Sequence, residues 1–163
     1  MLITVISDAS LCHETGIAGY GYWVKSDRGG TRGSGVLQGH NSSSLVAEMR
    51  ALMNGLHAAL KEGLAVKGDK FLLQTDCEGV ITTFTGKRKR FLNVQELEAV
   101  EYFKTMIARF ELTYEFRHVK GHTKREGNRY LAQAWCDEKA GDAMRSARRK
   151  QRIEVANANA KSS

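Results

Sequence analysis

Four carboxylates lie within or beside apolar segments, where a charged side chain is costly. Asp8 ends the run LITVISD, Glu48 borders an apolar helical stripe, Asp76 follows FLLQT, and Asp137 lies in AWCDEKAGDA. A carboxylate in apolar surroundings needs a cation or hydrogen-bond donors to compensate its burial. Hard oxygen ligands suit Mg²⁺ or Mn²⁺. Two such ions about 4 Å apart can activate a water and stabilise the leaving oxygen in a displacement at phosphorus. The four acids therefore indicate metal-dependent phosphodiester chemistry.

Each of these acids also has an ordinary structural interpretation. Asp8 could accept from turn amides, Asp76 could cap a helix, and Asp137 could face solvent. Glu48 could close a capping box only if position 45 were serine or threonine, and that position is Leu45. The prediction of a metal site therefore depends on the set of four acids and not on any one of them.

The chain must fold so that these acids converge. Hydrophobic periodicity predicts strands and helices in the order βββαβααβα. The expected strands cover residues 2–8, 19–26, 32–39, 71–76 and 111–119, and the expected helices cover 45–60, 77–84, 94–110 and 129–149. This order indicates an α/β fold, with a mixed five-stranded sheet flanked by helices. If the first and fourth strands are neighbours, Asp8, Glu48 and Asp76 meet at one edge of the sheet.

Length and charge fit one domain that binds a polyanion. A chain of 163 residues with 42% hydrophobic residues and a net charge of +7 can bury a single core. Six Lys/Arg and one acid lie from Arg145 onward, so we expect a catalytic domain over 1–145 and a basic tail over 146–163. Localised Lys and Arg suit phosphates. The alternative is a solvated face and a disordered tail.

The sequence also argues against several classes of protein. No apolar run is long enough to span a bilayer, and the N-terminus MLITVISDAS lacks the features of a signal peptide. We therefore expect a cytoplasmic protein, a monomer without a membrane partner or a small-molecule cofactor. Cys12, Cys77 and Cys136 form no CxxC pair, so reduced thiols are a better interpretation than a zinc site.

Five segments together resemble the type 1 ribonuclease H family over residues 1–145. They are, in the family's order, ITVISDAS with GYGYWV, SLVAEMRALMNGLHAAL, LLQTDCEGV, HVKGHT and WCDEKAGDAM. The resemblance implies hydrolysis of the RNA strand of RNA/DNA hybrids with two ions, Mg²⁺ or Mn²⁺. It implies that Asp8, Glu48 and Asp76 bind one ion and that Asp8 and Asp137 bind the other. It also implies that His122 assists proton transfer or product release. The ordinary alternative for His122 is a surface loop histidine.

The chain departs from the family pattern where the substrate would bind. Ala9 follows Asp8 where the family has glycine, the loop LCHETGIAGYG lacks the common GNPG segment, and the basic handle is reduced to GKRKR. We expect 2′-hydroxyl contacts at Cys12, Ser43 and Ser44. The expected phosphate contacts are Lys87, Arg88, Lys89, Arg90, Lys120, Lys124 and Arg125.

Two rival functions use the same residues. A nuclease of the same fold could act on DNA junctions or transposon ends, because two metal ions serve those reactions equally well. A noncatalytic nucleic-acid binding module is the second rival. The VKGHT segment and the spacing of the motifs favour hybrid cleavage, and the presence of all four acids argues against a noncatalytic module.

Overall fold

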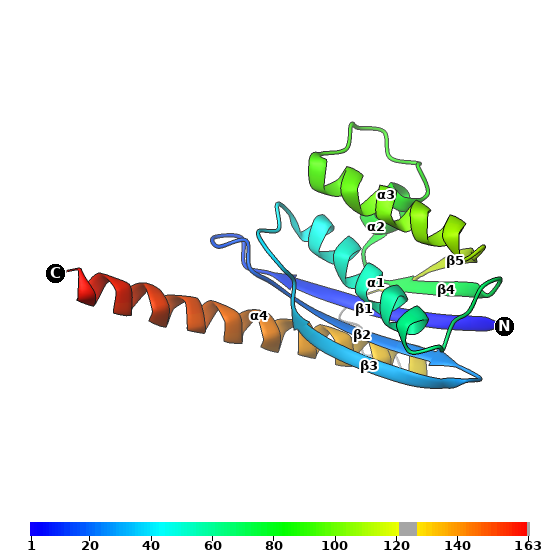
Figure 1. Ribbon diagram of the computed structural model, residues 1–163, viewed down its shortest axis with the longest axis horizontal. Helices are drawn as coiled ribbons and strands as arrows, with labels where there is room; N and C mark the ends of the chain where they lie inside the picture. The colour runs from blue at the N-terminus through cyan, green and yellow to red at the C-terminus, as the bar shows by residue number, and fades with distance from the viewer. Residues whose placement is uncertain (121–126, 163) are drawn as a thin grey trace.

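The structure is a computed structural model that describes residues 1–120 and 127–162 (Figure 1). Within these residues the chain forms the predicted five-stranded mixed sheet, and its strands lie in the order β3-β2-β1-β4-β5. The strands and helices are β1 Leu2–Leu11, β2 Ala18–Ser26, β3 Gly29–Val36, α1 Ser44–Lys61, β4 Lys70–Thr75, α2 Glu78–Phe84, α3 Val94–Arg109, β5 Thr113–His118 and α4 Asn128–Lys161.

The centre of the sheet is β1, which pairs antiparallel with β2 and parallel with β4. Ile6 of β1 lies opposite Gln74 of β4 in the register. Because β1 and β4 run in the same direction, their carboxyl ends meet at one edge of the sheet. The expectation that the first and fourth strands are neighbours is confirmed, and their adjacency places Asp8 beside Asp76.

Helices cover both faces of the sheet (Figure 1). The α1 helix packs on one face with α2 and α3 stacked beyond it, and its buried Met49, Leu52 and Leu56 belong to the main core. The α4 helix packs on the other face through small residues, among them the buried Cys136 and Ala140. The close approach of α4 to the sheet depends on glycines in β2. A Cβ at Gly21, for example, would lie only 2.6 Å from the carbonyl oxygen of Cys136.

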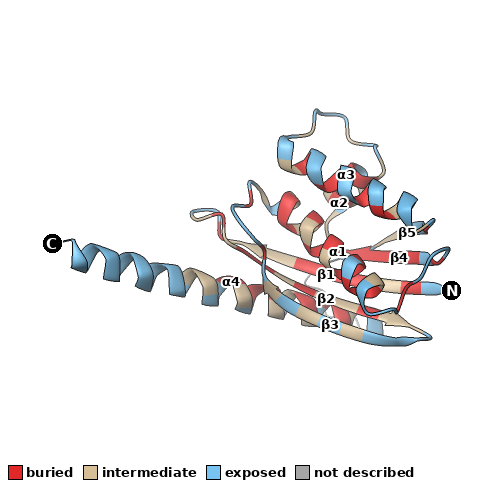
Figure 2. Ribbon diagram, in the orientation of Figure 1, coloured by how far each residue is buried: buried red, intermediate tan, exposed pale blue. Residues whose placement is uncertain are grey.

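The last helix is longer than the sequence pattern predicts. It continues past the expected end at Arg149 to Lys161, because the alanine-rich segment after it contains good helix formers and neither glycine nor proline. Figure 2 shows that this outer part of α4 is exposed along its length. The β2–β3 hairpin is also tighter than expected, since β3 begins at Gly29. In the described part of the chain, no helix combines the length and the apolar character needed to cross a membrane.

Candidate metal centre

Three of the predicted acids meet at the carboxyl edge of β1 and β4. Asp8 lies on β1, Glu48 on α1, and Asp76 directly after β4. One oxygen from each carboxylate lies within 4.8 Å of the others. The backbone N–H of Ala9 donates to Asp8 Oδ1 at 2.9 Å and to Glu48 Oε1 at 3.2 Å, so a single amide orients two of the three carboxylates. The arrangement is a compact group of acids that includes a buried aspartate, Asp8.

The electrostatics of this carboxylate cluster, Asp8, Glu48 and Asp76, oppose full ionisation. Burial, together with the charge of Asp76, raises the pKa of Asp8 to about 7. Burial and the adjacent Asp8 raise the pKa of Glu48 well above its ordinary value. At neutral pH the cluster therefore holds protons or binds a cation, because like charges this close in a desolvated site destabilise each other.

Glu48 provides a direct test of whether these residues fit a cation. Its Oε2 is buried and makes no hydrogen bond to any residue in the described part of the chain. A buried, unpaired carboxylate oxygen is costly, and coordination of a cation would satisfy it. Three convergent carboxylates supply the hard oxygen ligands that Mg²⁺ and Mn²⁺ prefer. The residues present therefore fit a divalent cation.

The structure also tests the capping interpretations. The α1 helix is capped by Ser43, whose side chain accepts from the N–H of Val46, so Glu48 is not a capping residue. The α2 helix begins after Cys77, which occupies the N-cap position. Asp76 lies one residue before this N-cap, and its carboxylate lies close to those of Asp8 and Glu48.

Asp137 approaches the carboxylate cluster from α4, on the other side of the sheet from α1. It is half-buried, and its charge contributes to the raised pKa of Asp8. It is not one of the three acids whose oxygens lie within 4.8 Å of one another. The predicted catalytic residue His122 and the predicted phosphate contacts Lys124 and Arg125 lie outside the described residues.

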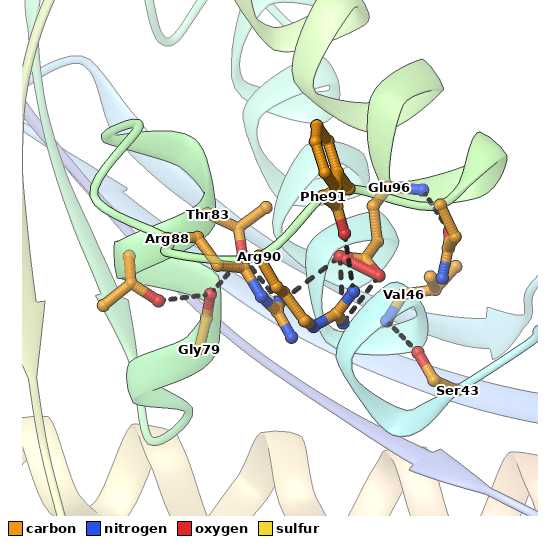
Figure 3. Close-up of polar contacts among 10 residues, drawn as sticks. Ser43, Val46, Gly79, Thr83, Arg88, Arg90, Phe91 and Glu96 are labelled. Carbon is orange, nitrogen blue, oxygen red and sulfur yellow. Dashed lines mark hydrogen bonds and ion pairs between the residues drawn. The ribbon is translucent and has the colours of Figure 1, made fainter.

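The basic loop between α2 and α3 divides into two pairs of residues. Arg88 and Arg90 bind the fully buried Glu96 of α3, with N–O distances of 3.3 and 2.9 Å (Figure 3). Arg88 also donates to Thr83 Oγ1 at 2.9 Å. Lys87 and Lys89 are exposed. Two of the four expected phosphate contacts are thus engaged in holding the loop to α3.

Sequence reasoning missed Glu96, although a local signal was present. The N-cap of α3 is Asn93, whose side chain accepts from the N–H of Glu96. Asparagine followed three residues later by glutamate marks a helix start. That pattern predicts a glutamate in the first turn of the helix, but it does not predict that this glutamate is buried against two arginines.

The other predicted contact residues lie in different environments. Cys12 is buried, and the pKa of its thiol is lowered by hydrogen bonding from Thr15. Ser43 is engaged as the cap of α1, whereas Ser44 and Lys120 are exposed. Exposed side chains can contact a ligand without rearrangement, so Ser44 and Lys120 are the better placed of these four residues.

A mixed sheet in the order β3-β2-β1-β4-β5, with carboxylates converging at the ends of β1 and β4, defines a ribonuclease H-like protein. The chain belongs to the reverse transcriptase-like family, whose family model matches residues 6–136. The predicted likeness to type 1 ribonucleases H is confirmed at the level of family and fold. No curated protein sequence matches the chain.

Solved structures of ribonucleases H share this fold. The N-terminal RNase H domain of Rv2228c from Mycobacterium tuberculosis is 21% identical, with a TM-score of 0.70 over 92% of this chain and 98% of that one. RNase H1 of the halophilic archaeon Halobacterium salinarum is 19% identical, with a TM-score of 0.69 over 90% and 99%. LC11-RNase H1 in complex with RNA/DNA hybrid is 17% identical, with a TM-score of 0.69 over 89% and 98%. LC11-RNase H1 was isolated from compost by a metagenomic approach.

Proposed function

We propose that this protein is a metal-dependent endonuclease that hydrolyses the RNA strand of RNA/DNA hybrids. The observation that carries the proposal is the carboxylate cluster, in which three acids converge and Glu48 Oε2 is buried without a hydrogen bond. Family membership supports a ribonuclease H-like activity. The fold is shared with LC11-RNase H1, a protein whose structure was determined in complex with RNA/DNA hybrid, and this supports the choice of substrate.

Asp8, Glu48 and Asp76 would hold one divalent ion, and the family resemblance assigns a second ion to Asp8 and Asp137. Ions bound there supply Lewis-acid chemistry, since they lower the pKa of a bound water and stabilise charge on the leaving oxygen. Ala9 contributes by fixing Asp8 Oδ1 and Glu48 Oε1 through one N–H. Because the pKa values of Asp8 and Glu48 are raised, these carboxyl groups release protons when they bind an ion.

Substrate phosphates would contact cations near the carboxylate cluster that the fold leaves exposed. Lys87 and Lys89 of the basic loop and Lys120 after β5 are exposed and are the candidates for these contacts. Arg88 and Arg90 position the loop through Glu96. The resemblance assigns His122 to proton transfer or product release. The ions are Mg²⁺ or Mn²⁺, and no small-molecule cofactor takes part in the proposed reaction.

The test is a cleavage assay with labelled RNA/DNA hybrid, RNA/RNA and DNA/DNA duplexes in Mg²⁺ or Mn²⁺. We expect the wild-type chain to cut the RNA strand of the hybrid and Asp76→Asn to lose at least about 100-fold in rate, because charge stabilisation at a reacting phosphate contributes several kcal/mol. Asp142→Asn is the matched control, since Asp142 is an exposed acid on α4.

The same assay separates the rival functions. Cleavage of duplex DNA alone would assign the chain to the DNA nucleases of this fold. Hybrid binding without cleavage in either metal would assign it to the noncatalytic modules. Wild-type rates from Asp76→Asn would show that the carboxylate cluster is not the catalytic centre.

A further inference from the structure

A second site lies on the α4 face of the sheet. It is a cavity of about 700 Å³ between β1, β2, β5 and the start of α4. Thr4 lines it from β1, with Lys25 directly opposite on β2. Arg117 lines it from β5, and Arg129 and Tyr130 line it from α4. Ile6, the lining residue of β1 nearest to the carboxylate cluster, precedes Asp8 by two residues, roughly 7 Å along an extended strand, and none of Asp8, Glu48 and Asp76 lines the cavity.

The cavity concentrates positive charge. Lys25, Arg117 and Arg129 line it, and no acid is among its described lining residues. Burial and the proximity of Arg129 lower the pKa of Arg117, so two guanidinium groups lie close together in a partly desolvated site. Within residues 1–120 and 127–162, none of these three cations forms an ion pair with an acid.

Two arginines elsewhere in the described chain bind buried acids instead. Arg28 binds the buried Asp69, and Arg88 binds the buried Glu96. Arg117 donates from Nε and Nη2 to a neutral acceptor, Gln74 Oε1. Partly desolvated cations are normally compensated by anions. Three of the described lining residues of this cavity are cations, a composition that suits an anionic ligand.

We infer that this cavity binds a phosphate group, supplied by a nucleotide or by a nucleic-acid backbone. The planar guanidinium groups of Arg117 and Arg129 match the geometry of phosphate oxygens, and Lys25 adds a third charge. The volume lies within the range of small-molecule sites. Tyr130, which lies under the Arg129 guanidinium at 5.9 Å, supplies an aromatic wall beside the phosphate position. The inference does not require the chain to cleave a hybrid.

The first test is calorimetric titration of the full chain with pyrophosphate in EDTA. We expect saturable binding to the wild type and at least a tenfold loss of affinity in Arg129→Gln, a substitution of an exposed side chain. Arg109→Gln is the matched control, because Arg109 is also exposed and lies over the ring of the next residue, Phe110, at 5.5 Å. Equal melting temperatures would show that both variants fold.

A second measurement distinguishes the two sources of phosphate. Hybrid affinity is measured in EDTA as a function of salt, and each lost backbone contact reduces the slope by about one. A reduced slope in Arg129→Gln identifies a nucleic-acid backbone, and an unchanged slope with lost pyrophosphate binding identifies a free nucleotide or phosphate. The inference is overturned if Arg129→Gln alters neither measurement, or if Arg109→Gln alters them equally.

Discussion

Two kinds of buried acid coexist in this chain, and their partners distinguish them. Asp69 binds Arg28 and the N-terminal ammonium group, and its pKa is held far below its ordinary value by Arg28. Glu96 binds two arginines. Asp8 and Glu48 instead lie against each other and share one amide donor. The first kind stabilises the fold, whereas the second kind is stable at neutral pH only with protons or a cation.

This contrast predicts how stability depends on pH without metal. The pKa of Asp8 is about 7 in the folded chain and lies near 3.8 when unperturbed. Between these values the folded state binds more protons than the unfolded state, so its stability falls as pH rises from about 4 to about 7. Asp8→Asn lacks this penalty. In EDTA we expect it to be more stable than the wild type by about 1 to 3 kcal/mol at pH 8 and nearly equal at pH 4.

Urea unfolding at both pH values measures this difference. The comparison between the two proteins removes the opposite effect of Asp69, whose contribution is lost only in acid. Mg²⁺ should stabilise the wild type at pH 8 and have little effect on Asp8→Asn, because binding to the folded state alone raises stability. A difference between the two proteins that does not change with pH would contradict the assignment of the raised pKa to Asp8.

The buried charge of Glu96 should also contribute to the stability of the fold. Glu96→Gln removes the only charge that binds both Arg88 and Arg90 in the described structure, while the side chain keeps its size. We expect the free energy of unfolding to fall by about 1 to 3 kcal/mol. This is less than the loss of about 3 to 5 kcal/mol that is typical when a fully buried ion pair is broken, because both arginines are partly exposed. Urea unfolding tests this, with the exposed Glu98→Gln as control. Equal stability of the two variants would show that the arginines find other partners.

At the scale of the element, the contact between β2 and α4 controls where Asp137 lies. Gly21 lies directly opposite Asp8 in the sheet, and its missing side chain lets α4 approach. A Cβ there would lie 2.6 Å from the carbonyl oxygen and 3.0 Å from the Cα of Cys136, the residue before Asp137. Backbone atoms cannot give way as a flexible side chain does, so α4 must move.

Gly21→Ala should therefore affect both the stability of the fold and the binding of Mg²⁺ proposed for the carboxylate cluster. We expect the free energy of unfolding to fall by about 1 to 3 kcal/mol, which is typical of overpacking. We also expect Mg²⁺ to stabilise the variant less than the wild type, because Asp137 moves relative to Asp8. Thermal unfolding with and without Mg²⁺ measures both effects. Ser34→Ala is the control, since Ser34 is exposed and lies opposite Gly21 on β3. Unchanged unfolding of Gly21→Ala would mean that α4 adjusts at no cost.

The elements also show how far sequence patterns extend. Periodicity predicted the order of strands and helices along the chain, because side-chain periodicity reports which face of an element is buried. The convergence of Asp8, Glu48 and Asp76 followed from placing the first and fourth strands side by side. It did not predict the length of α4, since an exposed helix carries no apolar stripe to mark its end. The pairing of Arg88 with Glu96 and the cavity at Arg117 were also missed. Both depend on residues brought together by tertiary contacts, which no local pattern records.

At the scale of the whole molecule, positive charge is concentrated on the projecting end of α4. Six Lys/Arg and a single acid lie from Arg145 onward. The residues beyond Arg149 are exposed, and α4 extends away from the sheet (Figures 1 and 2). If the chain binds a nucleic acid as proposed, this projecting basic helix can contact phosphates away from the carboxylate cluster and compensate for the short basic loop, in which two of four cations bind Glu96.

This geometry makes charge neutralisation a cleaner test than truncation, because Ala147 and Arg148 are partly buried and their removal would expose the surface they cover. The variant carries Arg149→Gln, Lys150→Gln and Arg152→Gln. In EDTA we expect its hybrid affinity to fall roughly tenfold at low salt and its salt slope to fall by up to about three, since each lost phosphate contact contributes about 0.9. The three side chains are exposed, so the melting temperature should stay unchanged.

A control with Lys67→Gln, Lys104→Gln and Arg109→Gln removes the same charge from other exposed positions. If both triple variants lose hybrid affinity equally, the effect comes from net charge and not from the position of the cations. If neither variant loses affinity, the end of α4 does not contact the hybrid.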